Sequence, residues 1–263
     1  MSEAFIVDAH VHLGQPGAFF APETGAAELL AVMDRLGIQS AIGTDHLSIH
    51  EGCGTTLPGL RELFERSQGR LHYLGVFDPR RSEECLRALE AARDWPGLAG
   101  LKIHPSFHRT PAEHPSYGPA WRFAAEYGLP ILTHSWSVSD TNPVQALSTP
   151  DRFEGWVRQF PEVRLVLGHA GGRGLQQEDA LRMANEYPQV YLDIAGDVFC
   201  FRLIEKLVER VPVSKVLFGS DFPWLDPRAN LSRVLLADVP LAAKARILVE
   251  NAHRVYRLGG TPC

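Results

Sequence analysis

Eight short runs of β-branched and apolar residues recur along the chain at roughly thirty-residue intervals, and segments with helical spacing lie between them. Alternation of this kind is typical of repeated βα units and therefore of a parallel sheet. Eight such units close a β/α barrel, and 263 residues fall in the size range of one barrel domain. The runs are Phe5–His10, Gln39–Thr44, Leu71–Phe77, Ala99–His104, Pro130–His134, Val163–Gly168, Val190–Ala195 and Lys215–Ser220.

Helices are indicated where apolar residues recur at three-and-four spacing between these runs. An open Rossmann-like sheet is the alternative architecture, but it needs a glycine fingerprint after the first strand. The glycine cluster at residues 171–174 comes far too late for that role. We therefore predict a single-domain (β/α)8 TIM barrel over residues 1–263. The predicted helices are Ala26–Leu36, Ser82–Trp95, Tyr117–Tyr127, Gln177–Tyr187 and Phe201–Val211.

Composition excludes several classes of partner. The chain carries 26 Lys and Arg against 31 Asp and Glu, a formal charge of −5, without a run of like charge. This balance offers no electrostatic footprint for nucleic acid or an anionic membrane. No stretch is apolar enough to span a bilayer, and we expect no secretory signal. The four scattered cysteines are predicted to be free thiols in a reducing compartment, which favours the cytoplasm: Cys53, Cys85, Cys200 and Cys263.

The first run ends in two histidines, His10 and His12. Side chains two residues apart on a strand point the same way, so both imidazoles can reach one metal ion. Neutral imidazole suits zinc and its neighbours in the periodic table. A catalytic zinc site needs further protein ligands and an open position for water, which other strand ends would have to supply.

Three more strand ends carry suitable side chains. His134 closes the fifth run, His169 follows the sixth and Asp221 follows the eighth. Active sites of barrels lie at the carboxyl ends of the strands, where residues distant in sequence meet. The sequence therefore predicts that these three side chains join His10 and His12 in a catalytic site.

With these residues in view, the whole chain resembles the amidohydrolase superfamily. Within it, the chain is most similar to the amidohydrolase-related branch that includes aminocarboxymuconate-semialdehyde decarboxylase. Asn251 and Arg254, in the last matching stretch, are expected to tie the final helix to the barrel. The matching stretches are residues 8–12 (DAHVH), 100–105 (GLKIHP), 133–134 (TH), 168–172 (GHAGG), 217–223 (LFGSDFP) and 251–254 (NAHR).

The resemblance implies a divalent metal held by His10, His12, His134 and Asp221, with His169 as the acid or base beside it. One zinc ion is the simplest expectation, and manganese is the alternative. The resemblance also implies a homodimer, because dimers are common in this branch.

Lys102, on the fourth strand, admits two interpretations. In binuclear members of the superfamily a lysine at this position is carboxylated and bridges two metals, which would add a second ion here. Alternatively, Lys102 stays a simple ammonium that pairs with a substrate carboxylate or a nearby acid, and this is the interpretation we favour. The His104 side chain is expected to point to the same side of the strand as Lys102, which makes it a second candidate for substrate contact.

Other polar and aromatic residues near the strand ends are candidates for substrate binding. Trp136 and Trp224 could wall a pocket for a planar or apolar substrate, or else cap the core. Arg173 could bind a carboxylate with its planar guanidinium, or else face solvent. Asp45 and His46 follow the second strand, where a polar turn is the simpler interpretation.

Hydrolysis of a small amide, lactone, ester or carbocycle by metal-activated water is the reaction we expect first. Nonoxidative decarboxylation of a small carboxylic acid is the alternative, and the short chain favours hydrolysis because large decarboxylases carry elaborated loops. TatD-like phosphoesterases usually place a glutamate on the fourth strand, where Lys102 and His104 stand here. A barrel that binds ligands without catalysis is a further hypothesis.

Overall fold

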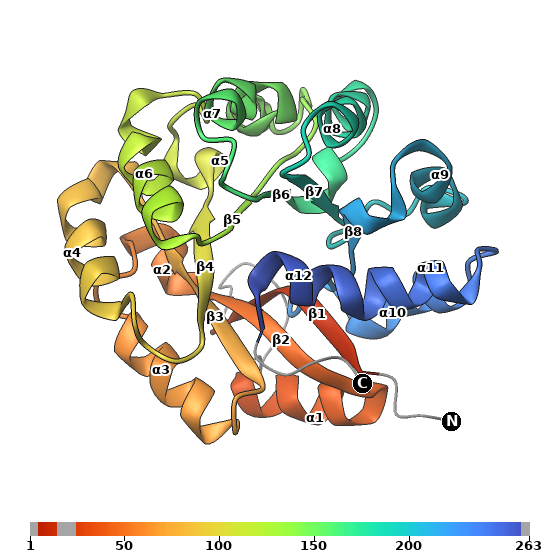
Figure 1. The fold of residues 1–263 in the computed structure, drawn as a ribbon, viewed down its shortest axis with the longest axis horizontal. Coiled ribbons are helices and arrows are strands. Elements are labelled where there is room, and N and C mark those ends of the chain that lie inside the picture. The colour runs from red at the N-terminus through yellow and green to blue at the C-terminus, as the bar shows by residue number, and fades with distance from the viewer. Residues whose placement is uncertain (1–4, 15–24, 259–263) are drawn as a thin grey trace.

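The computed structural model describes residues 5–14 and 25–258. Its eight parallel strands form one sheet in the order β1 to β8, which curls into a barrel with helices around it (Figure 1). This confirms the predicted (β/α)8 fold. The strands are β1 Ile6–Leu13, β2 Ile38–Asp45, β3 Leu71–Val76, β4 Leu98–Ile103, β5 Ile131–Thr133, β6 Leu165–Leu167, β7 Val190–Asp193 and β8 Val216–Leu217.

The seam between the first and last strands is held by backbone hydrogen bonds. The amide of Ala9 donates to the carbonyl of Phe218 at 2.9 Å, and the amide of Asp221 donates to the carbonyl of His10 at 2.8 Å. The chain beyond β8 therefore runs alongside β1 and closes the barrel. This pairing also brings Asp221 next to the two histidines of β1.

All five predicted helices are present, and the first has the predicted bounds. The final helix was also expected, whereas the helices at residues 46–66, 105–108, 154–159 and 227–245 were not predicted. The helices are α1 Ala26–Leu36, α2 His46–Glu51, α3 Leu57–Arg66, α4 Ser82–Ala92, α5 Pro105–His108, α6 Gly118–Tyr127, α7 Glu154–Gln159, α8 Leu175–Glu186, α9 Leu203–Arg210, α10 Pro227–Leu235, α11 Leu241–Ala245 and α12 Asn251–Tyr256.

The buried apolar side chains divide into an outer and an inner core. The outer core lies between the strands and the surrounding helices. The inner core includes Val7, Ile42, Leu74, Leu132 and Leu217 from the strands, together with side chains of α12. As expected, the Asn251 side chain holds α12 to the barrel, since its amide donates to the carbonyls of Val213 at 2.8 Å and Val216 at 2.7 Å. Arg254 in turn donates to the Asn251 side chain at 3.1 Å.

A bulge in β1 changes which residues face the barrel interior. Asp8 pairs with Ala41 and Val11 pairs with Gly43, so two residues, Ala9 and His10, oppose one residue of β2. Val7 and Ala9 belong to the inner core, whereas Val11 and Leu13 belong to the outer core. The inward-facing positions thus shift from odd to even numbers at the bulge, which aims His10 and His12 inward.

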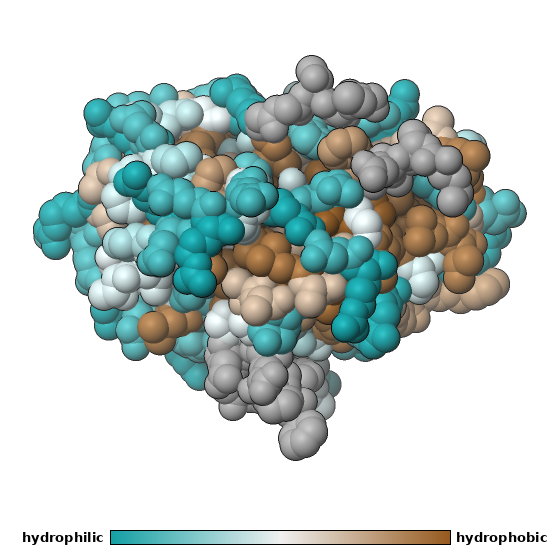
Figure 2. Space-filling view, turned by 90° about the horizontal axis from the view of Figure 1, so that it is seen from below, coloured by the Kyte–Doolittle hydropathy of each residue, from teal (hydrophilic) through white to brown (hydrophobic). Residues whose placement is uncertain are grey.

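Apolar side chains also lie on the surface, at the end of the molecule that α10 and α11 occupy in Figure 1. Leu236 and Leu241 are more than four-fifths exposed there, and the brown area at the right of Figure 2 marks this end.

Among the described residues no helix is long and apolar enough to cross a membrane. Cys53 and Cys85 are buried free thiols, Cys200 is exposed, and Cys263 lies outside the described residues.

Candidate metal centre and active-site pocket

Two histidines of β1 and the aspartate after β8 form a compact cluster. The Nε2 atom of His12 lies 3.1 Å from Oδ1 of Asp221, and Nε2 of His10 lies 3.9 Å from the same oxygen. One ligand atom from each residue lies within 4.8 Å of the other two. The structure thus brings together three of the four metal ligands expected from the resemblance.

The donor set of this cluster fits a divalent ion. Two imidazoles and a carboxylate are ligands that zinc and related ions accept, and metal binding requires neutral imidazole. Burial lowers the pKa of His12 well below its usual value and also lowers that of His10. Both rings are therefore neutral at pH 7 and available as ligands.

His134, the fourth expected ligand, lies beside this cluster and outside the 4.8 Å group. Its Nδ1 faces Nε2 of His169 at 3.2 Å, and its Nε2 lies 2.8 Å from Oε1 of Gln145. The ring of His134 also stacks on His104, with 4.2 Å between centroids. The metal-binding role of His134 stays a prediction.

His169 is held in one orientation by the loop after β7. Its Nδ1 lies 3.0 Å from the carbonyl of Ala195, and a carbonyl can only accept, so Nδ1 carries a proton. In the neutral ring Nε2 is then an unprotonated nitrogen. Gly196 makes this approach feasible, because it has a φ of +85° and an added Cβ would lie 2.5 Å from Nδ1 of His169.

Backbone strain gathers at the same place. His169, Ala170 and Asp221 have φ values of 60°, 47° and 66°, in the left-handed region that non-glycine residues rarely adopt. Such conformations cost on the order of 1 to 3 kcal/mol each and persist where surrounding contacts enforce them. Here they turn two of the predicted catalytic side chains toward the cluster.

Lys102 is buried beneath the histidines. Its Nζ lies 3.0 Å from Nε2 of His10, and burial lowers its pKa to about 8. His104 is buried as well, and its Nδ1 accepts a hydrogen bond from the amide of Phe107 at 3.3 Å. Neither residue lines the pocket described next, so their direct contact with substrate stays a prediction.

A pocket of about 230 Å³ opens above the cluster. Both predicted aromatic residues, Trp136 and Trp224, line it together with His169 and Asp221. Trp136 stands edge-on to His169, with 5.3 Å between ring centroids. The remaining lining residues are His134, Gln145, Gly196, Asp197 and Leu225.

Two other predicted substrate residues have partners within the protein. Arg173 lies at the rim, forms an ion pair with Asp197 at 2.9 Å and reaches over the ring of Trp136. Asp45 begins helix α2 by accepting a hydrogen bond from the amide of Ser48 at 3.0 Å. His46, the first residue of that helix, lies 5.4 Å from the ring of Trp224. Asp45 thus has the structural role that was the simpler interpretation.

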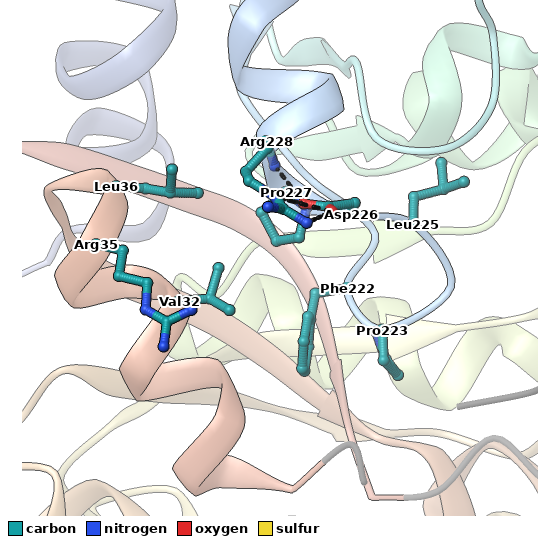
Figure 3. A pocket seen from close by; sticks show the side chains of 9 residues that line it. All are labelled: Val32, Arg35, Leu36, Phe222, Pro223, Leu225, Asp226, Pro227 and Arg228. Carbon is teal, nitrogen blue, oxygen red and sulfur yellow. Dashed lines mark hydrogen bonds and ion pairs between the residues drawn. The ribbon is translucent and has the colours of Figure 1, made fainter. Parts of the chain in front are cut away.

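A larger cavity of about 330 Å³ lies between α1 and the segment that leads into α10. Figure 3 shows Val32, Arg35 and Leu36 of α1 across from Phe222 and Pro223. Arg228 is turned toward Asp226 and forms an ion pair with it. None of the predicted metal ligands lines this cavity, so the pocket above the histidines is the better candidate for the active site.

Sequence reasoning missed two buried carboxylates, Asp8 and Asp193. Asp8 accepts the amide of Ser220 at 2.9 Å, and burial raises its pKa to about 7. Asp193 ends β7, and its Oδ2 lies 3.0 Å from Nδ1 of His10. The available signal was an acidic residue inside an otherwise apolar run, because carboxylates are rarely buried without a partner.

Comparison with known families agrees with this geometry. The sequence matches the family described as amidohydrolase over residues 7–258. The chain belongs to the amidohydrolase family. This confirms the resemblance drawn from the motifs, and it supports an enzyme that uses a divalent metal.

Solved structures of decarboxylases share the fold at low sequence identity. A 2,6-dihydroxybenzoate decarboxylase in complex with 2,6-dihydroxybenzoate is 15% identical with a TM-score of 0.77, covering 97% of this chain and 99% of that one. The 5-carboxyvanillate decarboxylase of Sphingomonas paucimobilis is 16% identical with a TM-score of 0.72 and the same coverage.

A dihydroxybenzoic acid decarboxylase of Polaromonas sp. JS666, with bound manganese and 2-nitroresorcinol, is 15% identical with a TM-score of 0.76 and covers 98% of both chains. A search of curated protein sequences gave no significant match. At these identities the structural matches establish the fold of this chain.

Proposed function

We propose that the protein is a metal-dependent decarboxylase of a small, planar carboxylic acid. The observation that carries this proposal is the composition of one pocket. His169, which can hold a proton, and Asp221, a predicted metal ligand, share a space of about 230 Å³ with Trp136 and Trp224. Aromatic side chains favour a flat substrate, and the small volume limits its size.

The structural neighbours support this choice over the hydrolysis that we expected first. Three of them are decarboxylases of substituted aromatic acids. The matches span 98 to 99% of the decarboxylase chains, so the length of this chain no longer favours hydrolysis. The phosphoesterase and non-catalytic hypotheses gain no support from the same comparisons.

We propose that His10, His12 and Asp221 hold one divalent ion, with His134 as the fourth ligand expected from the resemblance. Zinc is the first expectation and manganese the second, since imidazole and carboxylate accept both. When bound, the ion supplies Lewis-acid charge stabilisation to an anionic substrate.

The residues of the pocket supply the remaining chemistry. Trp136 and Trp224 orient the ring of the acid. Nε2 of His169, unprotonated in the neutral ring, takes up a proton from solvent, and the resulting imidazolium faces the carbon that bears the carboxylate. The bond between that carbon and the carboxylate breaks, and its electron pair stays on the carbon. The carbon takes the proton from Nε2, carbon dioxide leaves, and His169 regains a proton from solvent. The reaction consumes one proton, releases carbon dioxide and needs no oxidant.

Hydrolysis remains a second candidate because of the position of Asp221. This carboxylate both lines the pocket and touches His12 at 3.1 Å, and burial raises its pKa, with His169, His10 and Lys102 opposing the rise. A carboxylate so placed can accept a proton from attacking water. The substrate would then be a small ester, lactone or amide.

Product analysis in heavy water separates the two reactions. Protein loaded with Zn²⁺ or Mn²⁺ is incubated with 2,6-dihydroxybenzoate, 5-carboxyvanillate and related hydroxybenzoates. We expect release of carbon dioxide and one deuterium at the vacated carbon. Substitution His169→Gln should lower the rate at least about 100-fold while leaving the metal bound. Turnover of esters or lactones only, with no carbon dioxide from any acid, would replace this proposal with hydrolysis.

The number of ions tests the role of Lys102. With an uncarboxylated lysine, elemental analysis gives one equivalent of metal in both wild-type protein and the Lys102→Met variant. With a carboxylated lysine, wild-type protein holds two equivalents after incubation with bicarbonate and the variant holds one. We propose the first outcome, because Lys102 is buried with its Nζ directed at His10.

A further inference from the structure

We propose that Asp193 is a positioning residue that sets the tautomer of His10 and couples it to the loop carrying His169. The inference rests on the metal centre of the proposed function. Asp193 lies at the end of β7, its carboxylate reaches His10 of β1, and its side chain is fully buried. A buried carboxylate is costly unless hydrogen bonds compensate it.

Both oxygens of this carboxylate have partners. Oδ2 lies 3.0 Å from Nδ1 of His10, while Oδ1 accepts the amides of His169 at 2.9 Å and Ala195 at 3.0 Å. Two backbone amides donate to Oδ1, and hydrogen bonds of this kind favour the charged form of a carboxylate. The ionised group only accepts hydrogen bonds.

An anionic acceptor determines where the proton of His10 sits. Because Asp193 can only accept, Nδ1 of neutral His10 carries the proton and Nε2 keeps its lone pair. Nε2 is the atom that faces Asp221 and Lys102. Histidines that bind metals commonly donate their other nitrogen to a carboxylate, which fixes the ring and raises its basicity as a ligand.

The same carboxylate anchors the backbone around His169. The two amides that donate to Oδ1 belong to His169 and Ala195, and the carbonyl of Ala195 in turn accepts from Nδ1 of His169. His169 needs this support because its φ of 60° is unfavourable for a residue with a side chain. One side chain thereby links a predicted metal ligand to the predicted proton donor.

Substitution Asp193→Asn separates these two functions. The two backbone amides keep the carbonyl oxygen of the new amide as their acceptor, so its NH₂ group faces Nδ1 of His10. Two donors cannot face each other, and the proton of His10 must move to Nε2. Asp193→Ala instead removes every acceptor and should also weaken the loop.

The test measures zinc affinity by competition with a chelator and His10 tautomer by nitrogen-15 NMR of metal-free protein, the signals being assigned with His10→Ala. We expect Asp193→Asn to lower zinc affinity 10- to 100-fold and to switch His10 to the Nε2-protonated form, with a melting temperature near wild type. Asp193→Ala should lose similar affinity and melt at a lower temperature.

A matched control is Asp78→Asn, since Asp78 is also a buried carboxylate but is held by Arg80 at 2.7 Å. It should bind zinc as wild type does. Wild-type zinc affinity in Asp193→Asn, or an unchanged His10 tautomer, would overturn the proposal. A loss as large as that of His10→Ala would also overturn it and make Asp193 a direct ligand. These readouts use no substrate, so a failed decarboxylation assay would leave them unaffected.

Discussion

At its amino-terminal end the barrel interior is filled mainly by aliphatic side chains, with two tyrosines among them, whereas at the carboxyl end the same strands carry imidazoles, a lysine and carboxylates. Val7 and His10 stand three residues apart on β1, and Leu132, within β5, stands two residues before His134. The first end gains stability from burial of apolar surface. The second end buries polar groups that help folding only where hydrogen bonds compensate them.

This contrast indicates that one end of the barrel stabilises the fold, while the other end carries the residues for the chemistry. The inner core can hold the barrel together, which lets the opposite end keep strained residues such as His169 and Asp221. Changes at the metal end should then affect chemistry more than stability, and changes at the other end the reverse. The predictions below probe that contrast, from the largest expected effect to the smallest.

Removal of a metal ligand should abolish the chemistry with little effect on folding. For His12→Ala we expect loss of bound metal and a fall in decarboxylation of at least about 1000-fold, because Lewis-acid stabilisation is worth several kcal/mol. The free energy of unfolding of metal-free protein should change by less than about 1 kcal/mol. Elemental analysis, a carbon dioxide assay and urea denaturation give the three values. Full metal content in the variant would contradict the site.

Truncation in the inner core should have the opposite pattern. Leu132→Ala deletes fully buried methyl groups and should lower the free energy of unfolding by about 2 to 5 kcal/mol in urea denaturation. The folded fraction should still bind one equivalent of metal. Leu236→Ala, at a side chain that is 84% exposed, is the control and should change stability by less than about 0.5 kcal/mol. Equal effects of the two substitutions would contradict the packing described here.

A titratable group at the amino-terminal end should make stability depend on pH. Burial, with a smaller contribution from His253, lowers the pKa of His72 from 6.5 to about 4. Folding therefore favours the neutral ring. The contribution of this ring to the free energy of unfolding is complete above pH 6.5 and is lost as the pH falls to 4. By linkage this amounts to about 3 kcal/mol.

The unfolding free energy is measured at each pH for wild-type protein and for His72→Gln. The histidines of the metal site contribute equally to both proteins, so the difference between the two values reports on His72. The gap in unfolding free energy between the two proteins should change by that amount from pH 7 to pH 4, with the wild type losing more. A constant gap across this range would show that His72 titrates normally.

The aromatic walls of the pocket should affect substrate binding most. Trp136→Ala removes a side chain that lines the pocket and should raise KM by about tenfold with a smaller change in kcat. Trp95→Ala, at a tryptophan that contacts Arg61, is the control and should leave KM unchanged. A loss confined to kcat would argue that Trp136 positions His169 instead of the substrate.

Much of the fold could be predicted, because each strand is apolar and the helices between strands show a clear period. The ends of the shorter strands could not. Residues 215–220 predict one strand, yet β8 covers only Val216–Leu217, and the chain departs from extended backbone at Asp221, which has a φ of 66°. Helices α2 and α3 escaped prediction, as Gly52, Gly54 and Pro58 interrupt the helical pattern there.

The histidines of the site were predictable because strand ends of a barrel converge. Two features of the site were not predictable from the sequence. The bulge in β1 is invisible to a two-residue period, although it decides that His10 and Ala9 both face inward. Asp193 stands alone in an apolar run without a motif, and its contacts with His10 and His169 arise only from the closed barrel. The homodimer stays a prediction.

The central claim is that His10, His12 and Asp221 hold a catalytic divalent ion at the carboxyl end of the barrel. Anomalous diffraction from crystals of zinc-loaded protein, recorded above and below the zinc edge, tests it most directly. We predict a peak within bonding distance of Nε2 of both histidines and Oδ1 of Asp221. No peak at this end, or a peak enclosed by His10, His169 and Asp193 instead, would contradict the account.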